Sequence, residues 1–241
     1  MLPKNFFVNW YLSRGRQFPW REENTSPFAI MVTEMLLRQT RAAGVAKLWK
    51  ELMKKYPNPR ALGSANKESL KNLIGILGFG RMRSQALVMA SNFLLERHGG
   101  AVPESVDSLL KIPHIGRYAA HAVLCFGFGH DIEVVDGNVL RFFSRYNGLK
   151  VKPDIRRNPH VTEIAKSSLP RGTGKAALHN YGLLDFTAEI CRPIRPLCGN
   201  CSLAKSCQFR KSQIIVLRRN SRYHVHQIKV RSPTIPEPPA S

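Results

Sequence analysis

The sequence predicts an all-α protein in which helices pack on helices. Apolar residues recur at helical spacing in a series of segments, most of which carry charges on the opposite face. Glycine and proline separate these segments. Only 213–217 and 223–230 alternate in a way that suits a strand. In chain order, the expected helices are Phe28–Gln39, Ala42–Lys55, Lys67–Leu77, Met82–Arg97, Ser105–Ile112, Tyr118–Phe126, Val139–Tyr146 and Lys175–Ile190.

Each expected helix is bounded by residues that break helices. Phe28–Gln39 is an apolar run that contains a single acidic residue, and the three helices after it each have a charged face. The breaks fall at Pro57, Pro59, Gly78, Gly80, Gly99, Gly100, Pro103 and Gly116. The last ten residues, 232–241, are rich in proline, and we expect them to be disordered.

The composition favours a folded protein that binds a polyanion. The 241 residues are 43% hydrophobic, which is enough to form a core, and the formal net charge is +21. A basic protein without a polyanionic partner and a protein bound to an anionic membrane surface are the alternatives. No apolar run reaches the roughly 18 residues of a membrane-spanning helix, and residues 1–16 lack a secretory signal. We therefore expect no membrane association and, in a prokaryote, a cytoplasmic protein associated with the nucleoid.

Four cysteines lie within 17 positions, at Cys191, Cys198, Cys201 and Cys207, with the spacing C-x6-C-x2-C-x5-C. A compact segment can wrap four thiolates around one metal centre at little cost in loop-closure entropy. Structural zinc is the alternative, although zinc sites usually contain two C-x2-C pairs and this segment has one. The remaining cysteine, Cys125, lies in an apolar run and is expected to be a buried small residue.

The 6-2-5 spacing resembles the [4Fe–4S] loop of the endonuclease III and MutY-like DNA glycosylases, which belong to the helix-hairpin-helix superfamily. The resemblance implies that the four cysteines hold a [4Fe–4S] cluster. It also implies that the loop approaches the DNA backbone, where Arg192 and Arg195 in the first gap suit phosphates.

The segment Glu104–Val123 predicts two helices joined by a Pro-x-x-Gly turn. The start of the second helix offers free backbone N–H groups to a phosphate, Gly116 permits close approach, and Arg117 adds charge. An ordinary αα-hairpin is the alternative. The segment resembles the helix-hairpin-helix of the same superfamily, with His114 in place of the first glycine, and histidine tolerates a left-handed backbone better than most residues.

Asp136 lies in the segment Val134–Val139, at the start of a predicted helix. Aspartate at such a position is often a simple helix cap. The segment, however, resembles the V/L-D-G-N-V signature of the superfamily, which implies that Asp136 is the catalytic carboxylate and that Asn138 holds the turn or touches DNA. An anion near C1′ stabilises the sugar as the glycosidic bond breaks.

Glu34 is a single carboxyl group in an apolar helix, where it is costly unless it is paired or functional. The alternative is that it lies on an exposed face. The sequence T-E-M-L-L-R-Q-T resembles a helix of adenine glycosylases and of archaeal mismatch thymine glycosylases. The resemblance implies that Glu34 assists departure of the base, that Gln39 fills the hole left in the duplex, and that Arg38 belongs to the same DNA-binding segment.

The resemblance also implies a fold of two helical lobes with DNA in the cleft between them. Residues 24–129 would form a six-helix barrel that contains the helix-hairpin-helix. Residues 1–23 and 130–207 would form the iron–sulfur cluster domain, and 208–241 a basic, proline-rich tail. The expected partner is double-stranded DNA with a mismatched or damaged base, which must be flipped out of the helix, and the protein is expected to be a monomer.

Three features favour thymine or uracil opposite guanine as the target. The resemblance implies that Tyr118 is a catalytic-site residue with Asp136 and Glu34; tyrosine there is typical of the mismatch thymine glycosylases, whereas the bifunctional endonuclease III group has a Schiff-base lysine. Only 34 residues follow Cys207, too few for the domain that reads 8-oxoguanine, and Arg81 stands where MutY-like enzymes place a wedge tyrosine. The alternatives are an adenine glycosylase, which the Asp136–Val139 segment favours, and a non-catalytic DNA-binding redox sensor.

Overall fold

The structure is a computed structural model that describes residues 2–149, 159–172 and 174–213. Over these residues the chain is helical and contains no strand, which confirms the all-α prediction. No helix in these ranges is long and apolar enough to cross a bilayer. The helices are α1 (Phe6–Arg14), α2 (Pro27–Leu37), α3 (Ala42–Lys55), α4 (Pro59–Gly63), α5 (Lys67–Ile74), α6 (Gly80–His98), α7 (Val106–Leu109), α8 (Arg117–Ala122), α9 (Gly137–Asn147), α10 (Pro159–Ser167) and α11 (Ala176–Glu189).

All eight expected helices are present, but α1, α4 and α10 were not predicted. The prolines near α4 had been interpreted as a break, whereas Pro59 is the first residue of that helix and Asn58 caps it. Proline suits this first position because its missing N–H would have no partner there anyway. Residues 214–217 and 223–230 of the two possible strands, and the proline-rich end, lie outside the described residues.

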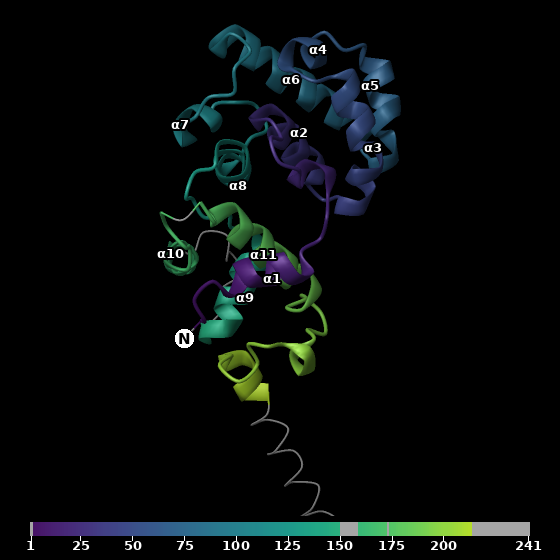
Figure 1. Cartoon of the computed structure of the whole chain (residues 1–241). Helices are drawn as coiled ribbons and strands as arrows, with labels where there is room; N and C mark the ends of the chain where they lie inside the picture. Colours follow the sequence, from purple (N-terminus) through teal and green to yellow (C-terminus); the bar gives the residue numbers. More distant parts are fainter. Residues whose placement is uncertain (1, 150–158, 173, 214–241) are drawn as a thin grey trace, which may run out of the picture.

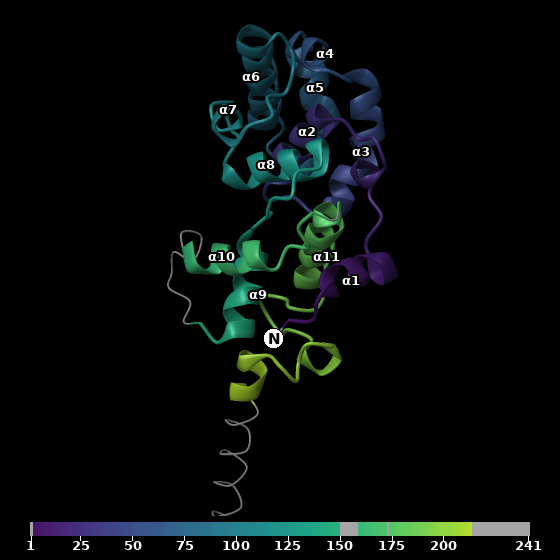
Figure 2. The same cartoon turned by 60° about the vertical axis from the view of Figure 1, so that its left-hand side comes forward.

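The helices form two lobes, which are visible in both views (Figures 1 and 2). The helices α2–α8 form one lobe around a large apolar cluster. The helices α1 and α9–α11, together with the cysteine segment 191–207, form the other, which we call the cysteine lobe. Phe18 and Trp20, which the expected boundary had assigned to the cysteine lobe, pack in the core of the α2–α8 lobe instead.

Helix α2 lies at the centre of its lobe, in contact with α3, α6 and α8. Nine of its 11 residues are buried. Ser26 caps the helix by accepting a hydrogen bond from the Ala29 N–H (3.2 Å), and Pro27 is the first helical residue. The helix is therefore fixed at its start, and any side chain along it is directed into the interior or toward a neighbouring helix.

In the cysteine lobe, the N-terminal helix α1 packs along α11 (Figure 1). The two backbones approach so closely at Gly182 that a β-carbon there would collide with the carbonyl group of Phe7. Phe7 and Phe186 meet at this crossing with a centroid distance of 5.7 Å. The absence of a side chain at Gly182 thus lets a segment from the start of the chain complete the core of the second lobe.

A buried ion pair connects the two lobes. Asp185 on α11 is 0% exposed, and the Arg21 side chain, which follows Trp20 of the other core, is 5% exposed. Arg21 forms two parallel hydrogen bonds with the Asp185 carboxylate, at 2.8 and 3.0 Å, and Arg16 adds further bonds. Bidentate pairing of this kind fixes both distance and orientation.

Replacing Asp185 with asparagine tests the weight of this ion pair. The variant keeps the shape of the side chain but leaves the Arg21 guanidinium buried without a counter-charge. We expect the free energy of unfolding at pH 7, measured by urea titration, to fall by about 3–5 kcal/mol. Glu68→Gln, which removes the exposed partner of Lys71, is the control and should cost about 0–1 kcal/mol. Equal losses in the two variants would contradict the structural role of Asp185.

The same pair should give a pH dependence of defined sign. Burial alone would raise the pKa of Asp185, but the hydrogen bonds and charge of Arg21, with the hydrogen bonds of Arg16, lower it below its ordinary value of 3.8. A carboxyl group with a lowered pKa stabilises the fold above its unfolded pKa, and this contribution is lost as the pH falls through the folded pKa. The stabilities of wild type and Asp185→Asn should therefore differ fully above pH 3.8 and converge below it.

Candidate active site

Glu34, Tyr118 and Asp136 meet where the two lobes join. Glu34 lies on α2, Tyr118 on α8, and Asp136 is the N-cap of α9. The side chains of Glu34 and Tyr118 share a hydrogen bond, and Asp136 is close enough to affect the pKa of both. The structure therefore brings together the three residues that the sequence had suggested for catalysis.

The Glu34 carboxyl group is buried and electrostatically strained. The residue is 7% exposed, which excludes the alternative of an exposed position on α2. Burial raises the pKa of Glu34 from 4.5 to about 7, and the nearby Asp136 adds to the rise. The hydrogen bond from Tyr118 and the charge of Arg21 oppose it. Near neutral pH, Glu34 can therefore either hold a proton or give it up.

Tyr118 provides the donor to this carboxyl group. Burial raises the pKa of the Tyr118 phenol well above 10, and the nearby Glu34 and Asp136 raise it further. The phenol therefore stays protonated and can donate a hydrogen bond across the pH range in which Glu34 titrates.

Asp136 is held in place by three hydrogen bonds. Its Oδ1 accepts from the backbone N–H groups of Asn138 (2.8 Å) and Val139 (2.7 Å), and its Oδ2 accepts from Asn138 Nδ2 (2.7 Å). Asn138 in turn accepts from Arg141 Nη1 at 2.8 Å. Asp136 is thus a helix cap, as one interpretation of the sequence held, but its charge also lies close enough to Glu34 to raise the pKa of that carboxyl group.

Arg141 connects this network to the cysteine segment. Its Nε and Nη2 donate to the carbonyl oxygen of Cys191 at 3.0 and 2.8 Å, and Nη2 also donates to that of Thr187 at 3.1 Å. A single guanidinium group therefore contacts both the first cysteine of the segment and Asn138, which donates a hydrogen bond to Asp136.

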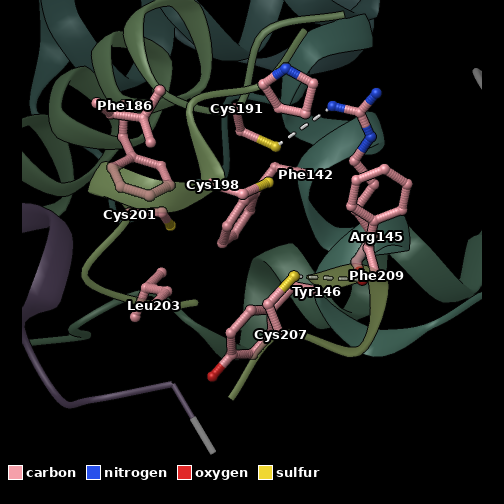
Figure 3. Close-up of a pocket in the computed structure, with 12 residues that line it drawn as sticks. Phe142, Arg145, Tyr146, Phe186, Cys191, Cys198, Cys201, Leu203, Cys207 and Phe209 are labelled. Carbon is pink, nitrogen blue, oxygen red and sulfur yellow. Dashed lines mark hydrogen bonds between the residues drawn. The ribbon is translucent and has the colours of Figure 1, made fainter. Parts of the chain in front are cut away.

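The four cysteines of the segment line one pocket. Their sulfur atoms lie around a common space that aromatic and aliphatic side chains close (Figure 3). Arg145 Nη1 donates to Cys191 Sγ at 3.7 Å. Among the described residues, no three His, Cys, Asp or Glu side chains converge tightly enough to hold a single metal ion. Cys125 is buried away from this cavity, as expected, and accepts a hydrogen bond from Asn180.

The Pro-x-x-Gly turn forms as expected. His114 adopts a left-handed backbone with φ 67°, and Gly116 is the N-cap of α8. Arg117 is exposed beside it. Arg192 and Arg195 are also exposed, and Arg195 has a φ of 51°. These side chains are accessible, and none of them belongs to the Glu34 site.

A second exposed element carries Gln39 and an aromatic residue that the sequence analysis missed. Gln39 follows α2, and Phe79 precedes α6; both have a φ of 55°. Phe79 is 66% exposed, and the two residues line the same hollow, together with Arg38 and His114. Arg81, which had been compared with a wedge tyrosine, is exposed on the first turn of α6 and is not part of the lining.

Three further residues of the site were not identified from the sequence: Arg21, Arg141 and Phe79. No local pattern identifies Arg21, because its partner Asp185 is 164 positions away in the chain. Arg141 could have been found, since it lies one helical turn after Asn138. Phe79 is flanked by glycines in the sequence, which was a usable signal of an exposed turn.

The chain matches the sequence profile described as HhH-GPD superfamily base excision DNA repair protein over residues 32–166. It is 34% identical to the thymine-DNA glycosylase of Aeropyrum pernix, over 83% of this chain and 90% of that protein. It is 33% identical to the thymine/uracil-DNA glycosylase of Pyrobaculum aerophilum, over 86% and 90%. It is also 34% identical to an endonuclease III of Thermotoga maritima, over 80% and 88%.

Solved structures resemble the fold closely. A thermostable thymine-DNA glycosylase aligns with a TM-score of 0.78 and 30% identity, covering 86% of this chain and 94% of that one. An endonuclease III in a non-covalent complex with DNA aligns with a TM-score of 0.73 and 22% identity, covering 89% and 99%, and this likeness bears on the fold alone.

The hydrogen bond between Tyr118 and Glu34 can be tested by titration. We expect the carboxyl infrared band of Glu34, identified by its loss in Glu34→Gln, to titrate with a midpoint at a pH of about 7. Tyr118→Phe removes the bond that lowers this pKa, so the midpoint should move upward. Tyr56→Phe removes a buried phenol elsewhere in the same lobe and should leave the midpoint in place. A midpoint near 4.5 in the wild type would contradict the burial of Glu34.

Proposed function

The chain belongs to the HhH-GPD superfamily of base excision DNA repair proteins, and from this premise we propose that it is a monofunctional DNA glycosylase that removes thymine or uracil mispaired with guanine. The observation that carries the proposal is the meeting of Glu34, Tyr118 and Asp136 at the lobe junction. The relatives named as thymine and thymine/uracil glycosylases match over most of their length.

Glu34 would act on the base. A flipped pyrimidine that enters the junction meets a carboxyl group whose pKa is about 7. Without a proton donor, the base would leave as an anion. In its protonated form, Glu34 can donate a hydrogen bond or a proton to the departing base. Tyr118 orients the carboxyl group through its hydrogen bond, so the proton is presented from a fixed position.

Asp136 would act on the sugar. The bond from the base to C1′ breaks with its electrons on the base, which leaves positive charge on the sugar. A carboxylate held by three donors can stabilise that charge without reorganising. It can then guide the water that replaces the base at C1′. We assign Asp136 to this step and Asn138 to holding its carboxylate.

The exposed residues would bind the DNA. The N-terminus of α8, with His114, Gly116 and Arg117, suits a backbone phosphate, and Arg192 and Arg195 suit another. Gln39 and Phe79 line the hollow and are exposed, and they would enter the base stack where the target has left it. We propose that a monomer binds double-stranded DNA across the cleft, with a mismatched base as its target.

Tyr118 supports a product with an unbroken strand. A phenol cannot form the imine that drives β-elimination, and an amine would be needed at this place. The enzyme should therefore stop at an abasic site. Thymine or uracil is favoured over adenine by Tyr118 and by the named relatives. Two observations favour adenine instead: the Asp136–Val139 segment and the relatives named as adenine glycosylases. A base-release assay distinguishes the two substrates.

We also propose that the four cysteines hold a [4Fe–4S] cluster. A single zinc ion requires four sulfurs about 2.3 Å from one point, whereas an iron–sulfur cluster occupies the space between its ligands. Four cysteines that line one pocket among apolar side chains, without a group tight enough for a single metal ion among the described residues, fit the larger group. When bound, the cluster would stabilise the segment and supply redox chemistry that base removal does not require.

Asp136→Asn is expected to abolish release of thymine and uracil from G·T and G·U duplexes while retaining binding. The amide keeps the size of the side chain and one oxygen that can accept from the N–H groups of Asn138 and Val139, but it carries no charge to stabilise the sugar. Single-turnover base release and fluorescence anisotropy measure the two effects, and Asp107→Asn, an exposed acid on α7, is the control. Wild-type release by Asp136→Asn would refute its assignment.

The same assay distinguishes the alternatives. Release of adenine from A·8-oxoguanine duplexes, with G·T and G·U untouched, would make the protein an adenine glycosylase. Binding without release of any base would make it a non-catalytic binder. Strand cleavage before alkali treatment would contradict the monofunctional assignment.

Iron analysis tests the cluster. Protein prepared without oxygen should contain iron and sulfide in equal amounts and absorb near 400 nm, at about the position typical of iron–sulfur ligation. Cys198→Ser should lose the absorbance, whereas Cys125→Ala should retain it because Cys125 lies outside the cavity. Zinc without iron in such a preparation would contradict the assignment.

A further inference from the structure

Arg83, on the first turns of α6, contacts both exposed loops of the hollow. Its Nε donates to the carbonyl oxygen of Gly78 at 2.9 Å. Its Nη2 donates to the carbonyl oxygen of Arg38 at 2.9 Å and to Thr40 Oγ1 at 2.6 Å. Two of these acceptors flank Gln39, and the third immediately precedes Phe79. One guanidinium group therefore joins the loops that carry the exposed residues Gln39 and Phe79.

The same side chain caps the helix that carries Glu34. Arg83 Nη1 donates to the carbonyl oxygens of Leu36 (2.9 Å) and Met35 (3.5 Å), in the last turn of α2. Helix C-terminal carbonyl groups lack partners within the helix and favour a cation. All five N–H groups of the guanidinium are thus used. A lysine at position 83 could supply charge to the helix end but could not span the acceptors.

The loops need such a brace because their backbones are strained. Gln39 and Phe79 both have a φ of 55°, in the left-handed region that side chains with a β-carbon adopt only at a cost. Such conformations persist where surrounding contacts over-determine them. The contacts of Arg83 with residues 38, 40 and 78 supply that constraint on both loops at once.

We propose that Arg83 is a positioning residue for base extrusion, holding Gln39 and Phe79 as one rigid, two-pronged element that enters the duplex. This inference rests on the proposed function, because it assumes that the target base is flipped. The prongs must meet the base stack in register, and loops that move independently would spend most encounters out of position. Arg83 fixes the relative positions of the two loops before DNA binds.

The test uses the Asp136→Asn protein, in which the base is flipped but not released, and a G·T duplex with 2-aminopurine next to the thymine. Extrusion unstacks the probe and raises its fluorescence, which stopped-flow mixing follows in time. We compare Arg83→Gln, Arg83→Lys and, as a stability control, Asn66→Ala. Asn66 caps α5 in the same lobe, so its loss destabilises the fold without touching either loop.

The expected result separates positioning from stability. Arg83→Gln should bind the duplex with similar affinity but extrude the base about tenfold to a hundredfold more slowly, the scale of a misplacement of about 1 Å. Arg83→Lys should unfold at the same midpoint temperature as the parent protein, because the lysine keeps a positive charge at the α2 terminus. Its extrusion rate should stay as low as that of Arg83→Gln. Asn66→Ala should lower that midpoint and leave the extrusion rate unchanged.

A mutant cycle shows whether Arg83 acts through the prongs. In a Gln39→Ala/Phe79→Ala background, Arg83→Gln should have little further effect on the extrusion rate, because there is nothing left to position. Full additivity, or an unchanged rate in Arg83→Gln alone, would overturn the role of Arg83. A parent protein that binds the mismatch with no fluorescence rise would instead overturn the proposed function, and this inference with it.

Discussion

The buried ion pair between Arg21 and Asp185 is the interaction on which the rest of the structure depends. Arg21 follows the Trp20 ring of one core, and Asp185 precedes the Phe186 ring of the other. Because neither charge is exposed to water, the pair holds only in one relative placement of the lobes. The site lies at that junction, so its geometry is set by a contact that does not itself face the substrate.

The ion pair also shapes the chemistry of the site. Arg21 stacks over the Tyr181 ring at 4.3 Å and lies close enough to Glu34 to lower its pKa. Asp136 acts in the opposite direction. Burial outweighs both effects and raises the pKa of Glu34 to about 7. Asp136 is held in place by its cap hydrogen bonds. Two carboxyl groups thereby acquire different tasks from their surroundings, a common arrangement in glycoside chemistry.

Local patterns in the sequence predicted much of this protein, and long-range contacts account for what it could not predict. The apolar spacing of α2 and the cysteine spacing are local, so the helix and the four-cysteine segment could be identified directly. Glu34, Tyr118 and Asp136 were named from motifs, but only the fold brings them together. Arg83 gave no signal at all, because its acceptors come from two separate loops.

Prolines caused the clearest error in the secondary structure. Pro59 marks the beginning of α4, but proline also ends helices, and only the Asn58 cap separates the two cases. The backbone of His114, by contrast, is predicted correctly: it is left-handed, a conformation that histidine tolerates better than most residues. Residues that act through backbone conformation can thus be predicted when their neighbours define a turn.

The pH dependence of thymine release under single-turnover conditions tests the central claim, that a buried Glu34 delivers a proton to the leaving base. The wild-type rate should fall as the pH rises through about 7, the pKa of Glu34. Glu34→Gln should be slower and should lack this fall in rate. A wild-type rate that holds steady to high pH, or a Glu34→Gln profile that keeps the same fall, would contradict this claim.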